Sequence, residues 1–148
     1  MEFNNPSQIF KDLNFGNKAK DRIISGVNKL TNAVKSTLGA SGKCVIYEDA
    51  MGQPVITKDG VTVAESVVLF DPVENIGATL IKEAASNTVK EAGDGTTTAI
   101  VLAESLLKTV NDPEYKDESI RNIKNGIESG LKKVMEYLSK YSTPVSGT

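Results

Sequence analysis

The sequence GDGTTT at residues 93–98 places an acid, two glycines and three hydroxyl groups directly before the apolar run AIVLAESLL. The simplest interpretation is a helix N-cap, in which Asp94 or one threonine accepts a hydrogen bond from a free backbone N–H group. One such residue is enough for a cap, and β-branched threonine is not a favoured helix former. Composition alone therefore leaves a helix cap and an anion-binding site as equal alternatives.

An anion-binding site would use more of this segment than a cap does. Gly93 and Gly95 leave the main chain open to a phosphate, and the helix N-terminus behind them presents unpaired N–H groups and about half a positive charge. The carboxylate of Asp94 would repel a bare phosphate, but a bridging Mg²⁺ binds one or two carboxylates together with phosphate oxygens. The segment therefore indicates metal-bound polyphosphate rather than phosphate alone.

Two other stretches combine glycines with polar residues. STLGASG at 36–42 follows a predicted helix, where a plain helix C-cap is the usual structure and a ligand-binding loop is the alternative. ITKDGVTV at 56–63 contains Asp59 before a glycine, which usually marks a tight turn. Because the chain has no histidine, Asp59 is also a candidate for orienting or deprotonating water. Neither stretch, nor GDG itself, matches a Walker A loop or a dinucleotide fingerprint.

Composition excludes several classes of function. The 148 residues, 39% of them apolar, are enough for one domain with a core. A net charge of -2 without a Lys/Arg stripe argues against nucleic acid. A single cysteine and no histidine exclude an internal disulfide and the usual zinc sites. The start lacks a signal or transit pattern and no apolar run is long enough to span a membrane, so we expect a cytoplasmic protein.

Apolar periodicity in the first half predicts one helix and one hairpin. The helix ends near Gly39, and its apolar face is formed by Ile23, Val27, Leu30, Val34 and Leu38. KCVIYED and QPVITKD flank a turn at AMGQP and predict a β-hairpin. The run VTVAESVVLF at 61–70 alternates poorly and is expected to be a third strand or a loop.

The second half predicts three further helices. The first begins at Asp71–Pro72 and stops at Gly93, with its apolar positions at Ile76, Leu80, Ile81, Ala84 and Ala85. The second, 96–110, is apolar nearly all round, which places it at the centre of a bundle. The third covers 120–138, where Gly126 and Gly130 indicate either a close neighbour or tolerated surface glycines. The fold class is mostly α: a helical bundle with a small β-hairpin.

The three glycine-containing stretches, in this order and spacing, resemble the group I chaperonins (GroEL-like proteins). TLGASGKCVI is similar to the family's Thr-Leu-Gly-Pro-Lys-Gly segment, PVITKDGVTVA to its Thr-Lys-Asp-Gly-Val segment, and AGDGTTTAIVLAESLL to its Asp-Gly-Thr-Thr-Thr signature. The resemblance runs from about Phe15 to Pro144. It implies a polar N-terminal extension at 1–15, the N-terminal half of the nucleotide-binding equatorial domain at 16–143, and the start of a hinge to an intermediate domain at 144–148.

The resemblance also implies a site for ATP with Mg²⁺ and K⁺. Asp94 would bind Mg²⁺, Lys58 would lie beside the K⁺ and phosphate region, and Asp59 would assist the attacking water as an auxiliary catalytic residue. The remaining implied contacts to the nucleotide and its phosphates are Thr37, Leu38, Gly39, Ala40, Gly95, Thr96, Thr97 and Thr98. Ala40 and Ser41 replace the family's Pro-Lys, so we expect weaker or altered binding at that loop.

The function implied is an ATP-binding segment of a ring-forming chaperonin that assists protein folding. The hairpin around Cys44 to Val55 and the N-terminal segment would pair with neighbouring subunits. The main catalytic aspartate and the domain that binds unfolded clients lie beyond this sequence in the family, so clients and a co-chaperonin would concern the intact protein alone, and whether this chain is itself an ATPase is left open. The alternative is a chaperonin-derived oligomerisation module that binds no nucleotide by itself.

Overall fold

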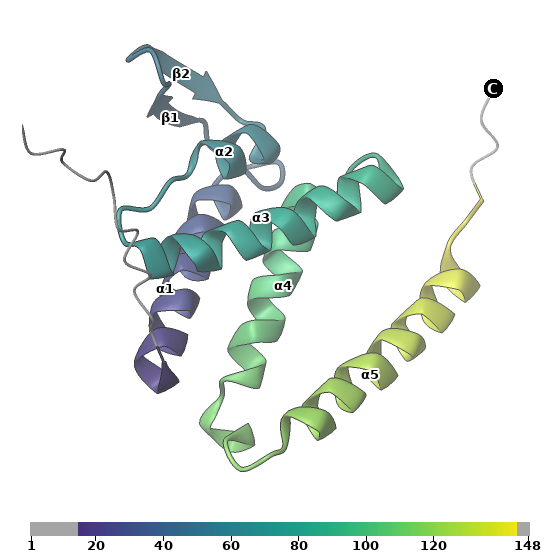
Figure 1. Cartoon of the computed structure of the whole chain (residues 1–148). Helices are drawn as coiled ribbons and strands as arrows, with labels where there is room; N and C mark the ends of the chain where they lie inside the picture. Colours follow the sequence, from purple (N-terminus) through teal and green to yellow (C-terminus); the bar gives the residue numbers. More distant parts are fainter. Residues whose placement is uncertain (1–14, 145–148) are drawn as a thin grey trace, which may run out of the picture. The chain divides into compact units, whose positions relative to one another are not determined.

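The computed structural model describes residues 15–144, which form two compact units divided after Leu107. The first unit contains the elements that carry the candidate site (Figure 1). In chain order these elements are α1 (Gly16–Lys35), β1 (Val45–Glu48), β2 (Pro54–Thr57), α2 (Gly60–Ser66), α3 (Pro72–Ala92) and α4 (Thr96–Val110). The predicted fold class, mostly helical with one small antiparallel hairpin, is confirmed.

The crossing of α3 over α1 organises the first unit, and two glycines permit it (Figure 1). A β-carbon on Gly26 would lie 1.8 Å from the Glu74 carbonyl oxygen, and one on Gly77 would lie 2.1 Å from the Ile23 carbonyl oxygen. Both helices can therefore approach until their backbones touch. The core packed around this crossing consists of Val27, Leu30, Val34, Val63, Ala64, Ala78, Ile81, Ala85 and Ile100.

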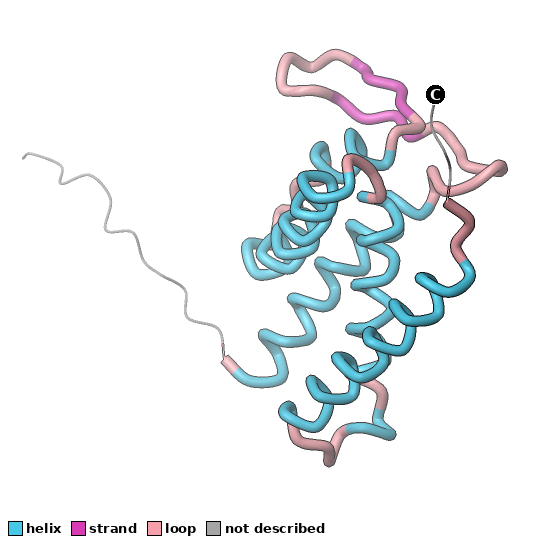
Figure 2. The backbone as a smooth tube through the Cα atoms, turned by 90° about the vertical axis from the view of Figure 1, so that its right-hand side faces the viewer, coloured by secondary structure: helices cyan, strands magenta, loops and turns pink. Residues whose placement is uncertain are grey.

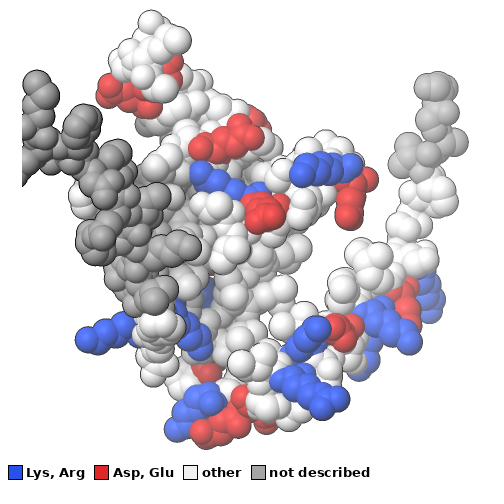
Figure 3. Space-filling view, viewed as in Figure 1, with Lys and Arg blue, Asp and Glu red and all other residues white. Residues whose placement is uncertain are grey.

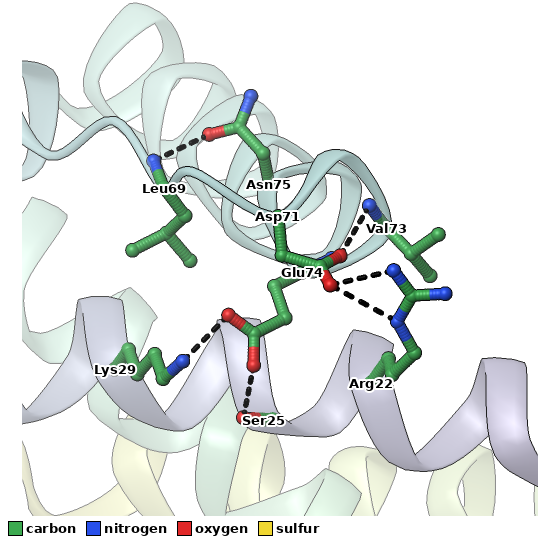
Figure 4. Close-up of polar contacts among 8 residues, drawn as sticks. All are labelled: Arg22, Ser25, Lys29, Leu69, Asp71, Val73, Glu74 and Asn75. Atoms are coloured by element: carbon green, nitrogen blue, oxygen red, sulfur yellow. Dashed lines mark hydrogen bonds and ion pairs between the residues drawn. The ribbon is translucent and has the colours of Figure 1, made fainter.

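Polar contacts fix the same crossing at its edge (Figure 4). Asp71, the N-cap of α3, accepts hydrogen bonds from the backbone N–H groups of Val73 and Glu74 and binds the Arg22 guanidinium at 2.5 Å. Glu74 accepts from the Ser25 hydroxyl at 2.8 Å and binds Lys29 Nζ at 2.6 Å. These partners lower the pKa of both carboxyl groups, through Arg22 first at Asp71 and through Lys29 first at Glu74.

The predicted hairpin is confirmed, and it projects from the helices of its unit (Figure 2). Val45 pairs with Thr57 and Ile46 pairs with Ile56 in antiparallel register. The sheet has two strands, so within the described residues both of its edges lack a neighbouring strand. Ile46 and Ile56 are 68% and 66% exposed, which makes the hairpin an apolar surface open to a partner.

The segment 61–70 corrects the sequence prediction, because it begins as a helix rather than a strand. Asp59 caps α2 by accepting from the N–H groups of Val61 and Thr62, while Val63 and Ala64 enter the core. The cap and the burial together outweigh the strand preference of the β-branched residues. At the other end, Lys82 Nζ donates to the carbonyl of Val67 at 2.5 Å, and burial lowers the pKa of this lysine.

The predicted bounds of α3 and α4 are confirmed, but the predicted buried faces are partly wrong. In α3, Ile76 and Leu80 are about half exposed, because the small residues beside them face α1 at the crossing. In α1, the helix ends before Leu38, which lies in the following loop and is 49% exposed. In α4, Leu102 and Leu106 are also exposed, so the first unit covers only one side of this helix.

The second unit contains a short 3₁₀ turn, η1 (Pro113–Tyr115), and the helix α5 (Ile120–Tyr141). Ser119 caps α5, and none of the helix residues is buried. Acidic and basic side chains alternate along its surface (Figure 3). Tyr137 and Tyr141 stack with ring centroids 4.3 Å apart. A β-carbon on Gly126 or Gly130 would meet nothing within 4 Å, so the described residues of the second unit give neither glycine a close neighbour.

Candidate functional site

Three segments that are separate in sequence meet at Gly60. A β-carbon on this residue would lie 2.1 Å from Thr97 Oγ1 and 3.4 Å from Thr37 Oγ1. The loop after α1, the N-terminus of α2 and the N-terminus of α4 are therefore neighbours. The structure thus brings together one member from each of the three predicted stretches.

The loop after α1 is closed by its own backbone. Thr37 Oγ1 donates to the Val34 carbonyl at 2.8 Å, and the N–H of Lys43 donates to the Ser36 carbonyl at 2.7 Å. Helix α1 is capped at Ser36, so Gly39, with a φ of 76°, belongs to the loop rather than to the helix end. Leu38, Gly39 and Ala40 are all exposed, and they leave an accessible rim beside Gly60.

Asp59 directly precedes Gly60, and its carboxylate is already engaged. Oδ2 accepts from the Thr62 hydroxyl at 2.5 Å and from the Thr62 N–H at 3.0 Å, and Oδ1 accepts from the Val61 N–H. These hydrogen bonds, the Thr62 hydroxyl first, lower the pKa of Asp59 below its usual 3.8. The lowered pKa makes this carboxylate a weaker base, so it is better suited to orienting water than to removing a proton. Lys58, beside it, is exposed.

The joint between α3 and α4 is made by residues 93–95. Gly93 ends α3 in the left-handed conformation, and Gly95 has a φ of 102°, so the chain turns within three residues. Asp94 Oδ1 accepts from the Gly95 N–H at 2.6 Å and remains exposed. This bond lies before α4, so Asp94 does not act as the simple N-cap that one interpretation of the sequence proposed.

The first turn of α4 retains hydrogen-bonding capacity. Within residues 15–144, no protein acceptor lies on the backbone N–H groups of Thr96, Thr97 or Thr98. Thr96 Oγ1 is buried without a partner in the same range. The Thr97 side chain faces Gly60, and Thr98 is exposed. A cavity of about 110 Å³ opens beside Thr96, lined also by Val61, Ala64, Glu65, Lys82, Ala85, Ser86 and Val89.

The arrangement fits a polyphosphate better than a free metal ion. Among the described residues there is no group of three acidic or other metal-binding side chains. Asp94 offers an exposed carboxylate next to the first turn of α4, so Mg²⁺ bound there would need its remaining oxygens from water and a phosphate. The unpaired N–H groups of α4 and the glycines at 60 and 95, which leave the backbone accessible, suit phosphate oxygens.

Sequence reasoning missed one charged pair close to this site. Glu104 of α4 is 1% exposed, and its Oε2 lies 2.6 Å from Lys35 Nζ at the end of α1. The sequence did contain an indication of this pair, because Glu104 is the one acid in the apolar run AIVLAESLL. An acid at that place in an otherwise apolar helix predicts either an exposed edge or a buried partner, and the structure shows the second.

Comparisons with known proteins identify the family of the chain. The TCP-1/cpn60 chaperonin family matches residues 30–148. The chain belongs to this family. This chain is similar to the chaperonin gp146 from bacteriophage EL 2 (Pseudomonas aeruginosa), whose crystal structure was obtained in the presence of ATP-BeFx. The two structures have a TM-score of 0.74 and 31% sequence identity. The match covers 88% of this chain and 23% of the phage chaperonin, so this chain spans about a quarter of that relative's length.

Two further observations concern the helices and the surface charges of this chain. Among the described residues, no helix is long and apolar enough to cross a membrane. The face visible in Figure 3 carries acidic and basic side chains interspersed.

Proposed function

We propose that this chaperonin chain forms the phosphate-binding part of an ATP site in a ring-forming chaperonin that assists protein folding. The observation that carries the proposal is the meeting of Thr37, Gly60 and Thr97. It brings two glycine-containing loops to a helix N-terminus whose first N–H groups have no acceptor among the described residues. Backbone donors, hydroxyl groups and a helix dipole converge there, and they suit a multiply charged phosphate chain.

Each predicted site residue has a role in this proposal. Thr96, Thr97 and Thr98 donate from backbone and hydroxyl groups to phosphate oxygens, Gly95 leaves room for their approach, and Asp94 binds Mg²⁺. The loop of Thr37, Leu38, Gly39 and Ala40 covers the nucleotide. Asp59, ionised at neutral pH, orients the attacking water, while Lys58 lies by the phosphates and K⁺. The ions would neutralise phosphate charge during phosphoryl transfer.

A second function is favoured by the hairpin. Its unpaired edges and its exposed pair of isoleucines suit strand addition by another subunit. The hairpin and the N-terminal segment would then contribute to a ring, as the sequence analysis expects, although residues 1–14 of that segment lie outside the described range. Without nucleotide binding, the chain would act as an oligomerisation module.

Calorimetric titration of the chain with Mg-ATP, with and without K⁺, tests the first function. We expect saturable binding that needs Mg²⁺ and falls at least tenfold in Asp94→Ala. The matched control is Glu91→Ala, which removes an exposed acid near the end of α3 and should leave affinity unchanged. Equal affinity in wild type and Asp94→Ala would remove Asp94 from the site. A wild-type chain that ignores Mg-ATP but associates with concentration would support the oligomerisation module instead.

A further inference from the structure

The buried charge pair between α1 and α4 lies outside the predicted site residues. Among the described residues, 15–144, Glu104 is the one charged residue that is buried, with a side chain 2% exposed. Its Oε2 lies 2.6 Å from Lys35 Nζ, and the Lys35 side chain is 37% exposed. Removing a carboxylate from water is costly, and the attraction to a partner only roughly compensates. The pair is therefore poorly explained as a source of stability.

Its position in the two helices suggests another role. Lys35 is the last residue of α1, two residues before Thr37. Glu104 follows Thr97 by seven residues, which is about two helical turns, so the two side chains lie on one face of α4. The Thr37–Gly60–Thr97 junction and the Lys35–Glu104 pair thus both link the end of α1 to α4, at points about two helical turns apart along α4.

We propose that Lys35 and Glu104 are positioning residues that set the distance between the loop after α1 and the N-terminus of α4. This inference rests on the proposed function, because the loop and the helix end are the two sides of the proposed phosphate site. An ion pair of short, directed hydrogen bonds favours one relative position of α1 and α4, because a shift of either helix weakens it, whereas the hydrophobic effect is non-directional. The pair acts through the loop and does not touch the nucleotide.

Two backbone hydrogen bonds within the loop after α1 can be used to measure this positioning role. The N–H of Gly42 donates to the Gly39 carbonyl at 3.0 Å, and the N–H of Lys43 donates to the Ser36 carbonyl at 2.7 Å. Both bonds close the loop directly after Lys35 and Thr37. If the end of α1 moves relative to α4, the exchange of these two amide hydrogens with solvent accelerates.

Amide hydrogen exchange on the 148-residue chain tests the proposal without nucleotide. In Glu104→Gln we expect the Gly42 and Lys43 amides to exchange at least tenfold faster, while the amides of the β1–β2 ladder keep their rates. The matched control is Glu74→Gln, which breaks the pair with Lys29 at the α1–α3 crossing. That variant should leave the Gly42 and Lys43 amides unchanged.

A double variant separates positioning from stability. Lys35→Met/Glu104→Leu replaces the pair by apolar side chains, a change that is often neutral or stabilising for a buried ion pair. We expect it to keep the urea midpoint of the wild type and still to show the faster loop exchange. Wild-type loop exchange in a folded Glu104→Gln or double variant would overturn the proposal.

Titration with Mg-ATP then links the pair to the site. If the wild-type chain binds, both variants should bind at least tenfold more weakly, and unchanged affinity would overturn the positioning role. If the wild-type chain does not bind, the proposed function fails for this chain. Loop exchange would still decide whether Lys35 and Glu104 set the position of the loop.

Discussion

Gly60 lies so close to Thr97 that a β-carbon on the glycine would be 2.1 Å from the threonine hydroxyl oxygen. The glycine begins α2 and the threonine lies in the first turn of α4, so this contact joins two helix N-termini. No side chain larger than hydrogen fits between them. The contact therefore fixes how closely the Lys58–Asp59 turn can approach the threonines.

Gly60→Ala should separate these two helix ends. We expect a loss of about 1–3 kcal/mol in the free energy of unfolding, the usual range for overpacking. Urea denaturation followed by circular dichroism gives the value. Thr97→Ala in the same background removes the clashing oxygen and should restore part of the loss, whereas an additive double variant would show that the contact is not the cause.

Alanine at the helix-crossing glycines should destabilise the first unit. Gly26→Ala and Gly77→Ala each place a β-carbon about 2 Å from a carbonyl oxygen of the other helix, and we expect each to cost at least 1–3 kcal/mol. Gly126→Ala is the matched control, since its β-carbon meets nothing and alanine favours the helix by about 1 kcal/mol. Equal urea midpoints for Gly26→Ala and wild type would contradict the close crossing.

The Arg22–Asp71 contact should make stability depend on acidity. Asp71 has a pKa below its unfolded value of 3.8, so the folded state binds its proton less readily than the unfolded state. The stabilisation is complete above the unfolded pKa and is lost as pH falls through the folded pKa. The free energy of unfolding should be measured from neutral pH to roughly pH 2. We expect Arg22→Met to lower it most at neutral pH, and the difference from wild type to disappear in acid. Lys124→Met removes an exposed ion pair in α5, and its free energy of unfolding should change with pH in the same way as that of wild type.

Charges on the hairpin should weaken subunit association. Ile46 and Ile56 are direct partners across the two strands and are both exposed, so lysines at both positions would repel an apolar partner without disturbing the core. Sedimentation velocity over a range of concentrations should show a smaller assembly for Ile46→Lys/Ile56→Lys than for wild type. Identical sedimentation would indicate that this face of the hairpin is not an interface.

Local signals explain what the sequence predicted well. Asp71 before Pro72 marks the start of α3, and Gly93 marks its end, because capping and left-handed φ are decided by residues next to one another. The hairpin likewise followed from a turn between two β-rich runs. The convergence at Gly60 is different, because periodicity does not measure distances between elements, and the grouping of the three stretches came from the chaperonin resemblance.

Tertiary packing explains what the sequence predicted poorly. Segment 61–70 contains strand-favouring residues, yet Asp59 caps a helix there and Val63 is buried within it. In α3 the large side chains Ile76 and Leu80 suggested the buried face, but close approach to α1 places Gly77 there instead. The Lys35–Glu104 pair joins residues far apart in sequence, and no local pattern specifies it.

The stacked tyrosines at the end of α5 give the second unit an optical signal of its own. The chain has no tryptophan and four tyrosines, so the Tyr137–Tyr141 pair supplies half of the tyrosines. The two rings stack because residues 137 and 141 lie one helical turn apart. The near-ultraviolet band should therefore fade as the end of α5 unfolds, and heating while this band is followed reports on that helix separately from the helical signal of the whole chain.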